Sequence, residues 1–386
     1  MSIRLKAYKF RLLPNKTQQV LLSKTFGCTR YFWNQQVAIF NSYNKEINPE
    51  PVFKTSTELR SEIGWMKDVS AAAIQQKEID FRQFKSQRFN KSRKKSIGDP
   101  KFKKKGSKDS YRLPNQKFKL IDDKIQLEKI GRVKFVKDRE IPECKFISVT
   151  VSRNPNGQYF ISVLIEQEIL PLPKTNKEVG IDVGLKEFYT SSDGVTVCNQ
   201  RYFRESQSKL KKLQKQLSKK KKGSSRREKL RLRVARVHQK ICDQRDYFLH
   251  SESTKLIKEF DIIVIEDLNV KEMLKNKKLS KSISDVSWSN FFSMLKYKAD
   301  WYGKTVVKIG RFEPTSKKCS CCGWIKEDLK LSDREFKCGG CGIVIDRDYN
   351  AAQNIKRVGV DALYNQSQSE CKTVLTAIHV EAIKVS

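Results

Sequence analysis

Two pairs of cysteines have the spacing of a metal site. Cys319 and Cys322 form one C-x-x-C turn, Cys338 and Cys341 form another, and fifteen residues separate the two turns. Each turn directs two thiolates at one ion, and four thiolates complete the tetrahedral coordination of a structural Zn²⁺. The spacing therefore predicts one zinc ion with no open position, so the metal has a structural and not a catalytic role. The alternative is that four buried or oxidised cysteines lie close together by chance.

Three carboxylates lie at the ends of predicted elements. Asp182 lies within the aliphatic run VGIDVG, Glu266 ends the apolar run DIIVIE, and Asp348 lies in DRDYNAA at the start of a helix-like segment. A carboxylate within an apolar strand is costly unless a cation balances it. Clustered carboxylates bind Mg²⁺, and two such ions about 4 Å apart hold the attacking water and the leaving oxygen of a phosphodiester. The order strand, strand, helix fits an RNase H-like nuclease. The alternatives are that Asp182 is a turn aspartate, that Glu266 is a surface acid at a strand end, and that Asp348 is a helix N-cap.

A large positive charge indicates that the partner is nucleic acid. The 386 residues include 79 lysines and arginines against 43 acids, a formal net charge of +36. Such a charge repels itself unless a polyanion neutralises it, and nucleic acid is favoured over a ribosomal role or a membrane surface. The basic residues come in blocks, with nine against one acid in residues 91–108 and fifteen against one in residues 209–240. The alternative for each block is a solvated charged loop or helix.

The elements that position these residues follow from hydrophobic periodicity. Residues 5–14 alternate as a strand, residues 15–85 have helical spacing, and residues 110–170 return to strands with a hairpin signal at NPNG. From Val179 strands and helices alternate, and residues 205–259 form two helices that are interrupted at KKKKGSS. A chain of this length exceeds one ordinary core, so two to four domains are expected.

No targeting or membrane-spanning segment is predicted. The first residues, MSIRLKAYKFRLLPNKTQQ, contain no apolar h-region, and the longest apolar runs have the length of a strand. The chain is therefore expected to be intracellular. The specific expectation is a cytoplasmic, nucleoid-associated protein of a prokaryote. Ten cysteines in a reducing compartment argue against disulfides.

The chain resembles the TnpB (OrfB) family, transposon-encoded RNA-guided DNA endonucleases related to type V CRISPR effectors. The resemblance covers nearly the whole chain and rests on blocks in family order: YKFRLLPNKTQQ with TRYFWNQ, WMKDVSAAAIQQ, GDPKFKKK, GIDVGLKEF, IVIEDLNV, PTSKKCSCCG, REFKCGGCG and DRDYNAAQNI. It implies a multidomain α+β protein: a RuvC-type, RNase H-like nuclease domain with an inserted zinc ribbon, and an N-terminal helical recognition domain inserted in a β-barrel wedge domain. The implied boundaries are 1–14 and 101–175 for the wedge, 15–100 for recognition, 176–311 for the nuclease core, 312–344 for the ribbon, 345–360 for the last acidic helix and 361–386 for a tail without a family motif.

By position in the family's motifs, the resemblance places the catalytic acids at Asp182, Glu266 and Asp348, with two Mg²⁺ ions. The last acid is the second aspartate of DRD. Asp346 is then a neighbour that would hydrogen-bond near the site, and Arg347 would anchor the phosphate of the scissile strand. The four cysteines belong to the ribbon, which interrupts the nuclease core just before the last acid.

The resemblance also implies two nucleic-acid partners, a guide RNA derived from the transposon end and a double-stranded target DNA that carries a short adjacent motif. The basic blocks would line the scaffold RNA and the guide–target heteroduplex, including Lys219, Lys220, Lys221 and Lys222. The segments SAAAIQQK and KDSYRL are candidates for reading the motif, because glutamine can pair bidentately with adenine. The residues named there are Gln76, Lys77, Ser110 and Tyr111, with an ordinary polar helix face as the alternative.

The function predicted from the sequence is metal-dependent, RNA-guided DNA cleavage linked to transposition. The alternative is an RNA-guided DNA-binding regulator or transposition accessory with weak or no cleavage, which the three intact acids disfavour. A third candidate is a DDE-type transposase that joins DNA strands. The inserted ribbon and the helical block between the first strands disfavour it.

Overall fold

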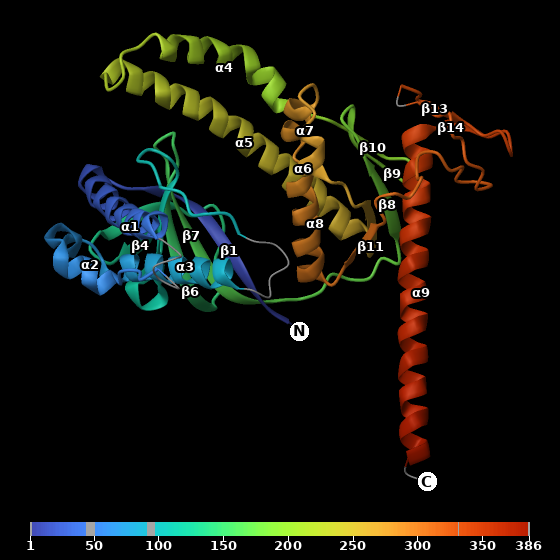
Figure 1. Cartoon of the computed structure of the whole chain (residues 1–386), viewed down its shortest axis with the longest axis horizontal. Coiled ribbons are helices and arrows are strands. Elements are labelled where there is room, and N and C mark those ends of the chain that lie inside the picture. The colour runs from blue at the N-terminus through green and yellow to red at the C-terminus, as the bar shows by residue number, and fades with distance from the viewer. Residues whose placement is uncertain (1, 44–50, 91–96, 331, 385–386) are drawn as a thin grey trace. The chain divides into compact units, whose positions relative to one another are not determined.

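The computed structural model describes residues 2–43, 51–90, 97–330 and 332–384, with side chains as far as residue 365. The chain divides into two compact units, which are coloured along the sequence in Figure 1. The barrel unit comprises Ser2–Glu168 and Gly223–Ala235, and the ribbon unit comprises Ile169–Lys222 and Arg236–Ser386. Each unit has its own apolar core.

A seven-stranded sheet forms the barrel unit and curls into a nearly closed barrel, with the spatial order β2-β6-β7-β1-β5-β4-β3 (Figure 1). Its strands are β1 (Ser2–Leu13), β2 (Asp109–Pro114), β3 (Phe118–Ile121), β4 (Lys124–Leu127), β5 (Gly131–Val136), β6 (Lys145–Arg153) and β7 (Tyr159–Ile169). Buried and partly exposed residues alternate along β2 and along most of β7, because successive side chains of a strand point to opposite faces. The hairpin predicted at NPNG is confirmed: it joins β6 to β7, with Gly157 at a φ of 85°.

Helices lie between β1 and β2 in the sequence. They are α1 (Lys16–Ser42), α2 (Ser56–Glu62), the 3₁₀ turn η1 (Gly64–Asp68) and α3 (Ala71–Phe89), and a further turn, η2 (Asn115–Lys117), follows β2. α1 and α2 begin with capping boxes at Asn15 and Thr55. Phe26 of α1 and Ala73 of α3 are buried in the same core as the barrel strands. The expected helical segment is therefore inserted in the sequence of the barrel. Residues 91–96 of the first basic block lie outside the described residues.

The ribbon unit contains a five-stranded sheet in the order β10-β9-β8-β11-β12. Its strands are β8 (Glu178–Val183), β9 (Glu187–Ser191), β10 (Thr196–Cys198), β11 (Ile262–Glu266) and β12 (Thr305–Ile309). β8, β11 and β12 run parallel, whereas β9 is antiparallel to both β8 and β10. Ile263 and Ile265 of β11 belong to one core cluster and Val264 to another, so β11 is buried on both faces. This burial explains the unbroken apolar run that predicted the strand.

Helices cover both faces of this sheet (Figure 1). One face packs against α5 (Ser225–Glu259), α7 (Ser280–Val286) and α8 (Trp288–Tyr302), and the other packs against α9 (Arg347–Lys384). The remaining helices are α4 (Tyr202–Ser218) and α6 (Val270–Met273). The approach of α9 to β8 and β11 is close, because a Cβ at Gly180 would lie 2.3 Å from the Ala352 oxygen and a Cβ at Gly359 would lie 2.2 Å from Val264 Cγ1.

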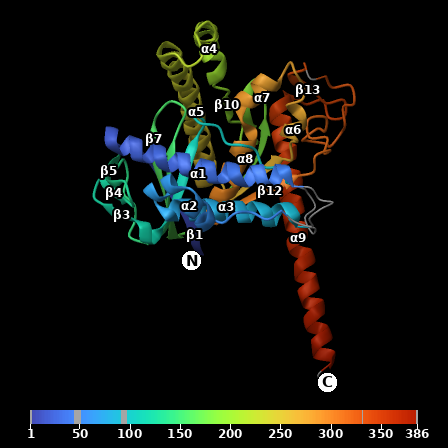
Figure 2. The same cartoon turned by 60° about the vertical axis from the view of Figure 1, so that its left-hand side comes forward.

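The segment that contains the four clustered cysteines lies between β12 and α9 in the sequence. It contains the two-stranded sheet of β13 (Glu335–Lys337) and β14 (Val344–Asp346), and an isolated bridge between Lys318 and Ile325. α9 continues past residue 360, where the C-terminal tail was expected to begin, and runs as one helix to Lys384 (Figure 2). In the part of the chain that the structure describes, no helix is long and apolar enough to cross a membrane.

Candidate metal centre and carboxylate site

The four predicted cysteines form one cluster. Their Sγ atoms all lie within 4.8 Å of one another, with 3.8 Å between Cys319 and Cys341 and 3.5 Å between Cys322 and Cys338. Four sulfurs bound at about 2.3 Å to a tetrahedral Zn²⁺ are about 3.8 Å apart, so these residues fit the ion. Cys321 is exposed and does not belong to the cluster. The predicted four-thiolate metal site is therefore supported by the geometry.

The backbone around the cluster favours metal-binding thiolates. Gly323 and Gly342 each follow a cysteine and adopt φ angles of 81° and 76°, which glycine tolerates without steric cost. The amides of Gly340 and Cys341 donate hydrogen bonds to Cys338 Sγ. Burial raises the pKa of the Cys338 thiol, but these amide hydrogen bonds, together with those from the Cys322 and Cys341 thiols, outweigh burial and lower the pKa to about 6. The thiolate that Zn²⁺ binds is thereby stabilised.

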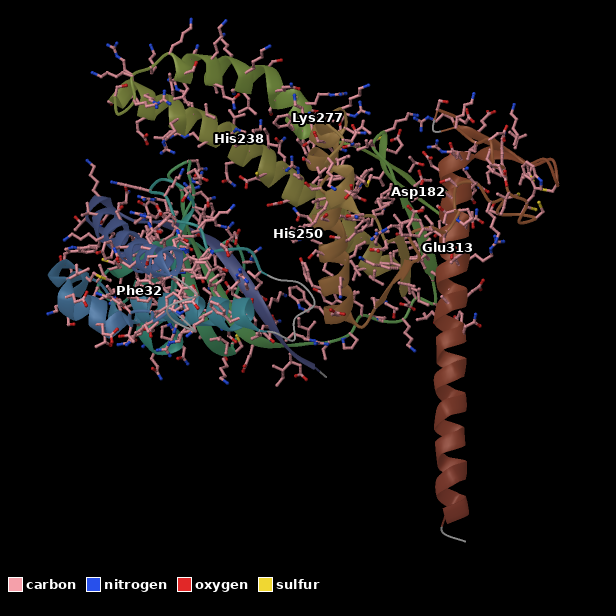
Figure 3. All side chains as sticks on the ribbon, viewed as in Figure 1. Phe32, Asp182, His238, His250, Lys277 and Glu313 are labelled. Carbon is pink, nitrogen blue, oxygen red and sulfur yellow. The ribbon has the colours of Figure 1, made fainter. Side chains whose placement is uncertain are left out.

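Two of the predicted acids lie on neighbouring parallel strands. Ile181 of β8 pairs with Ile265 of β11. The residues that follow them, Asp182 and Glu266, therefore lie side by side at the carboxyl ends of these two inner strands, which form one edge of the sheet. Asp348 lies in the first turn of α9, the helix that packs against β8. Figure 3 shows Asp182 in the sheet beside the N-terminal part of α9. Distant segments of the chain therefore bring the three acids to one edge of the sheet.

The three acids share one electrostatic environment. Burial, and then the negative charges of Glu266 and Asp348, raise the pKa of Asp182 well above its ordinary value. The positive charge of Arg347 acts in the opposite direction. A buried acid whose pKa is raised by neighbouring acids is typical of sites that bind cations or transfer protons.

A hydroxyl and two guanidinium groups contact these acids. Thr315 Oγ1 donates to Glu266 Oε1 at 2.8 Å, and Arg347 donates to Asp348 Oδ1 through Nε at 3.0 Å and Nη2 at 2.7 Å. Arg334 Nη1 lies 3.7 Å from Asp348 Oδ2. Among the described residues, the four cysteines are the only group of three or more His, Cys, Asp or Glu side chains placed to hold one metal ion. The three acids do not form such a group in the structure as it stands.

An open cavity of about 400 Å³ lies beside the acids. Asp182 and Asp348 line it, whereas Glu266 is not among its lining residues. The basic residues of its lining include Lys317, Lys330, Arg334 and Arg347. Carboxylates and cations that face one cavity suit a ligand that brings metal ions and phosphates together.

The start of α9 corrects one sequence interpretation. Asp346 Oδ1 accepts hydrogen bonds from the amides of Asp348 and Tyr349, both at 2.9 Å, so Asp346 is the N-cap of the helix. The alternative that Asp348 is the cap is therefore wrong, and its carboxylate faces the cavity. Asp346 hydrogen-bonds near the site, as the resemblance implied, but its partners are backbone amides.

Three parts of the sequence match known families. Residues 160–277 match OrfB_IS605, described as "Probable transposase"; residues 288–355 match "Cas12f1-like, TNB domain"; and residues 1–46 match HTH_OrfB_IS605, "Helix-turn-helix domain". A protein of Streptomyces pristinaespiralis named "Putative RNA-guided DNA endonuclease" is 37% identical over 369 residues, which cover 92% of this chain and 90% of that protein. An Escherichia coli K12 protein with the same name and the suffix InsQ is 31% identical, with 92% of each chain covered. The chain belongs to the TnpB (OrfB) family.

The TnpB resemblance predicted from the sequence blocks is thereby confirmed. A solved Cas12f1, in a complex with sgRNA and target DNA, matches 92% of this chain and 99% of its own, with a TM-score of 0.51 and 14% identity. A likeness at that identity shows that the two proteins share a fold. The match described as a helix-turn-helix covers β1 and α1, and its described residues form one strand and one long helix.

Two of the residues expected to contact nucleic acid are buried in the structure. Tyr111 of β2 is 2% exposed and packs against Phe26 in the barrel core, with ring centroids 5.6 Å apart. Lys77 of α3 is 8% exposed and pairs with Asp80 at 2.5 Å. The Tyr111 side chain therefore lies in the barrel core, whereas the side chain of Lys77 reaches the surface only at the small pocket that it lines.

The other residues expected to bind nucleic acid are at least partly exposed. Gln76 and Ser110 are half-buried, and Lys219, Lys220, Lys221 and Lys222 are exposed beyond the end of α4. Ser110 and Lys77 line one small pocket together with Arg30 and Lys103. Burial, and then the charge of Lys77, lower the pKa of Lys103 to about 8. The two segments named for motif reading therefore meet at one basic pocket.

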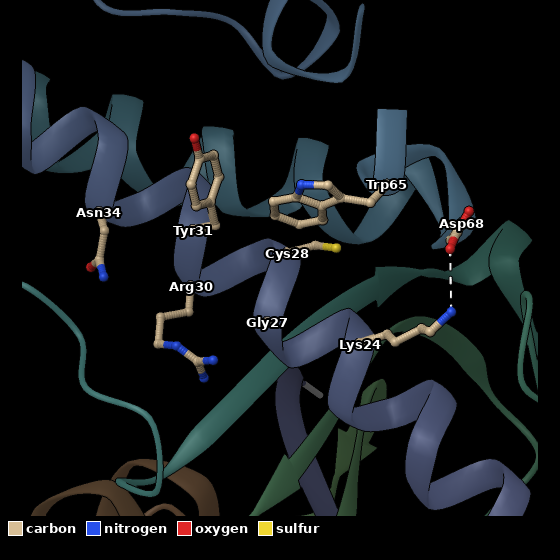
Figure 4. Close-up of a pocket in the computed structure, with 8 residues that line it drawn as sticks. All are labelled: Lys24, Gly27, Cys28, Arg30, Tyr31, Asn34, Trp65 and Asp68. Atoms are coloured by element: carbon tan, nitrogen blue, oxygen red, sulfur yellow. Dashed lines mark hydrogen bonds and ion pairs between the residues drawn. The ribbon is translucent and has the colours of Figure 1, made fainter. Parts of the chain in front are cut away.

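Sequence analysis missed a cavity of about 460 Å³ in the barrel unit (Figure 4). Its lining residues come from α1 and η1: Lys24, Gly27, Cys28, Arg30, Tyr31, Asn34, Trp65 and Asp68. The half-exposed Trp65 ring meets the Tyr31 ring edge-on, with centroids 5.1 Å apart. Lys24 pairs with Asp68 at 3.3 Å. Lys24, Cys28 and Tyr31 are spaced so that they lie on one face of a helix, and this spacing could have indicated the cavity lining.

Proposed function

We propose that this TnpB family member is a transposon-encoded, RNA-guided DNA endonuclease that cleaves target DNA next to a short motif by two-metal phosphodiester hydrolysis. The observation that carries the proposal is the convergence of Asp182, Glu266 and Asp348 at one edge of the five-stranded sheet. The names of the two relatives support the same activity. The mixed strand order, with helices on both faces, is compatible with a RuvC-type, RNase H-like nuclease core.

The three acids would hold the Mg²⁺ pair, because Mg²⁺ prefers hard carboxylate oxygens. When bound, the ions supply an activated water and stabilise the leaving oxygen of the scissile bond. The acids alone would repel a DNA strand, and the neighbouring Lys317, Lys330 and Arg334 offset this repulsion by pairing with phosphates. The four cysteines would hold one structural Zn²⁺, which keeps the ribbon folded.

A guide RNA derived from the transposon end and a double-stranded target DNA are the proposed partners. The net charge of +36 and the exposed lysines 219–222 support the binding of a polyanion. Base pairing with the guide would select the target sequence, while the protein would read the adjacent motif. Gln76 and Ser110 are the candidates for that reading, and Lys77 would contribute through the pocket that it lines.

Reconstitution tests this function. The protein is purified from cells, its co-purifying RNA is sequenced, and the complex is mixed with DNA that matches the guide and carries randomised flanking motifs. We expect cleavage in Mg²⁺ and none in EDTA. Asp182→Ala, Glu266→Gln and Asp348→Ala should each abolish cleavage and preserve RNA and DNA binding.

Other outcomes would favour the other candidate functions. Guided binding by the wild type without strand breaks would support the DNA-binding regulator, and joined strands would indicate a transposase. Equal cleavage in EDTA, or wild-type cleavage by Asp348→Ala, would contradict the two-metal assignment.

A further inference from the structure

The hydroxyl of Thr315 contacts the carboxylate of Glu266, which lies 49 residues earlier in the sequence. Thr315 is 5% exposed, and its Oγ1 donates to Glu266 Oε1 at 2.8 Å. Hydrogen bonds to a charged acceptor are roughly twice as strong as those between neutral groups. This bond engages one of the two carboxylate oxygens, so the other oxygen can bind a metal ion.

Two buried asparagines of α9 hold the backbone of the Thr315 segment. Asn354 Nδ2 donates to the carbonyl oxygens of Thr315 at 2.8 Å and of Lys318 at 2.6 Å. Asn350 Nδ2 donates to the same Lys318 oxygen at 2.8 Å, and Asn350 Oδ1 accepts from the Ser320 amide at 2.8 Å. Residues four apart lie on one face of a helix, so the two side chains act as one clamp, the asparagine clamp.

The two asparagines of the clamp are buried, so their side-chain amides depend on these hydrogen bonds. Asn350 is 0% exposed and Asn354 is 1% exposed, and an amide buried without partners would be costly. Arg357, one turn further along α9, donates to Asn354 Oδ1 at 2.9 Å and to the Ser320 oxygen at 3.2 Å. The segment that leads to the first cysteine pair is therefore fixed to the helix that carries Asp348.

The hydroxyl of Thr315 is explained by its contact with the Glu266 carboxylate and not by the clamp. The asparagine clamp holds Thr315 through its backbone oxygen, so the side chain is not needed for that contact. A valine is isosteric with threonine and would fill the same buried space, but it lacks the hydroxyl. Only the hydroxyl supplies a donor to Glu266, and metal-binding carboxylates are themselves oriented by such hydrogen bonds.

We propose that Thr315 is a positioning residue of the nuclease site and that the asparagine clamp sets its place. The hydroxyl holds the Glu266 carboxylate in the orientation in which it binds Mg²⁺, and the clamp keeps the hydroxyl within reach. This inference rests on the proposed function, because a metal-binding Glu266 is the group that Thr315 orients.

Two substitutions at Thr315 separate the hydroxyl from the shape of the side chain. Thr315→Val removes the donor and should lower Mg²⁺-dependent cleavage about 10–100-fold, the usual effect of losing a group that orients a metal ligand. It should also raise the Mg²⁺ concentration that gives half the maximal rate. Thr315→Ser keeps the donor and should recover most of the wild-type rate. Thr25→Val removes another buried hydroxyl, which donates to the Leu21 oxygen at 3.0 Å, and should cleave like the wild type.

Mn²⁺ binding to the protein–RNA complex, measured by calorimetry, gives a readout that does not depend on cleavage. Glu266→Gln should abolish binding at this site, and Thr315→Val should weaken it, while the zinc content and guide RNA affinity of Thr315→Val stay at wild-type levels. Loss of zinc or of guide RNA in Thr315→Val would show a structural role and overturn the positioning role.

The failure of this inference is distinguishable from the failure of the proposed function. If the wild type cleaves and Thr315→Val matches it in rate, Mg²⁺ dependence and Mn²⁺ affinity, the positioning role is wrong and the nuclease assignment stands. If the wild type binds Mn²⁺ through Glu266 and does not cleave, the nuclease assignment fails. Weaker Mn²⁺ binding by Thr315→Val would then still support the contact, and equal binding would overturn it.

Discussion

The ion pair between Asp261 and Lys304 is predicted to contribute several kcal/mol to the stability of the ribbon unit. Asp261 directly precedes β11, and its carboxylate accepts hydrogen bonds from Lys304 Nζ and from the amides of Thr175 at 2.9 Å and Asn176 at 2.7 Å. The side chain of Lys304 is 1% exposed and that of Asp261 is 20% exposed. Burial raises the pKa of Asp261, but Lys304 and the two amides outweigh burial and lower the pKa to about 2.

The size of the effect follows from this pKa. A fall from 3.8 to about 2 corresponds to about 2.4 kcal/mol, at about 1.36 kcal/mol for each pKa unit. Because the folded pKa is the lower one, this stability is present above about pH 4 and is lost as the pH falls toward 2. Asp261→Ala also leaves the buried Lys304 without a counter-charge, so its total cost at pH 7 should be about 3–5 kcal/mol.

Urea unfolding at pH 7 measures this cost, with zinc release to a chromogenic chelator marking the transition of the ribbon unit. Asp267→Ala is the matched control, because Asp267 directly follows β11 and pairs with Lys308 and Arg311. Its side chain is 41% exposed, and exposed pairs contribute only about 0–1 kcal/mol. A cost below about 1 kcal/mol for Asp261→Ala, or equal costs for the two variants, would refute the reasoning.

Three further predictions concern the zinc, the helix–sheet contact and the basic surface. Cys338→Ser should leave the protein with less than one zinc per chain and a destabilised ribbon, since structural zinc contributes about 10–16 kcal/mol of apparent binding free energy. Elemental analysis measures the zinc content, and a zinc-free wild type would contradict this prediction. Gly359→Ala should destabilise the ribbon unit by about 1–3 kcal/mol in thermal unfolding, because its methyl group meets Val264, whereas Gly64→Ala meets no atom within 4 Å and should be neutral. Glutamine at all four positions of Lys219–Lys222 should lower the log–log salt slope of RNA binding by about 0.7 for each lost single-strand phosphate contact, and an unchanged slope would exclude this segment from the interface.

Features that depend on short-range sequence were predicted well. The run IIVI of β11 is apolar throughout because the strand is buried on both faces. The NPNG turn joins β6 to β7, where Gly157 adopts the positive φ that the turn needs. The four cysteines converge because each C-x-x-C turn already places two thiolates together, so only the meeting of the two turns depends on the fold.

Features that depend on tertiary contacts were predicted poorly. The alternation of DSYRLP puts Tyr111 and Leu113 on one face of β2, but the burial of that face depends on the packing of the barrel core. Either aspartate of DRD could have capped α9, and the choice of Asp346 follows from its place at the end of β14. The contact of Thr315 with Glu266 has no local signal, because a single threonine in a polar segment is ordinary until the fold brings it to the carboxylate.

The zinc ribbon is connected to the proposed catalytic acids at both of its ends. At its start, Thr315 donates to Glu266 at 2.8 Å. At its end, the Arg347 amide donates to the Arg334 oxygen at 2.7 Å, one residue before Asp348. The cysteine cluster ties these two ends together, so loss of its metal would loosen the constraint on both acids at once. The ribbon can therefore influence the proposed Mg²⁺ site through the positions of Glu266 and Asp348. We expect zinc removal to lower cleavage before it unfolds the five-stranded sheet.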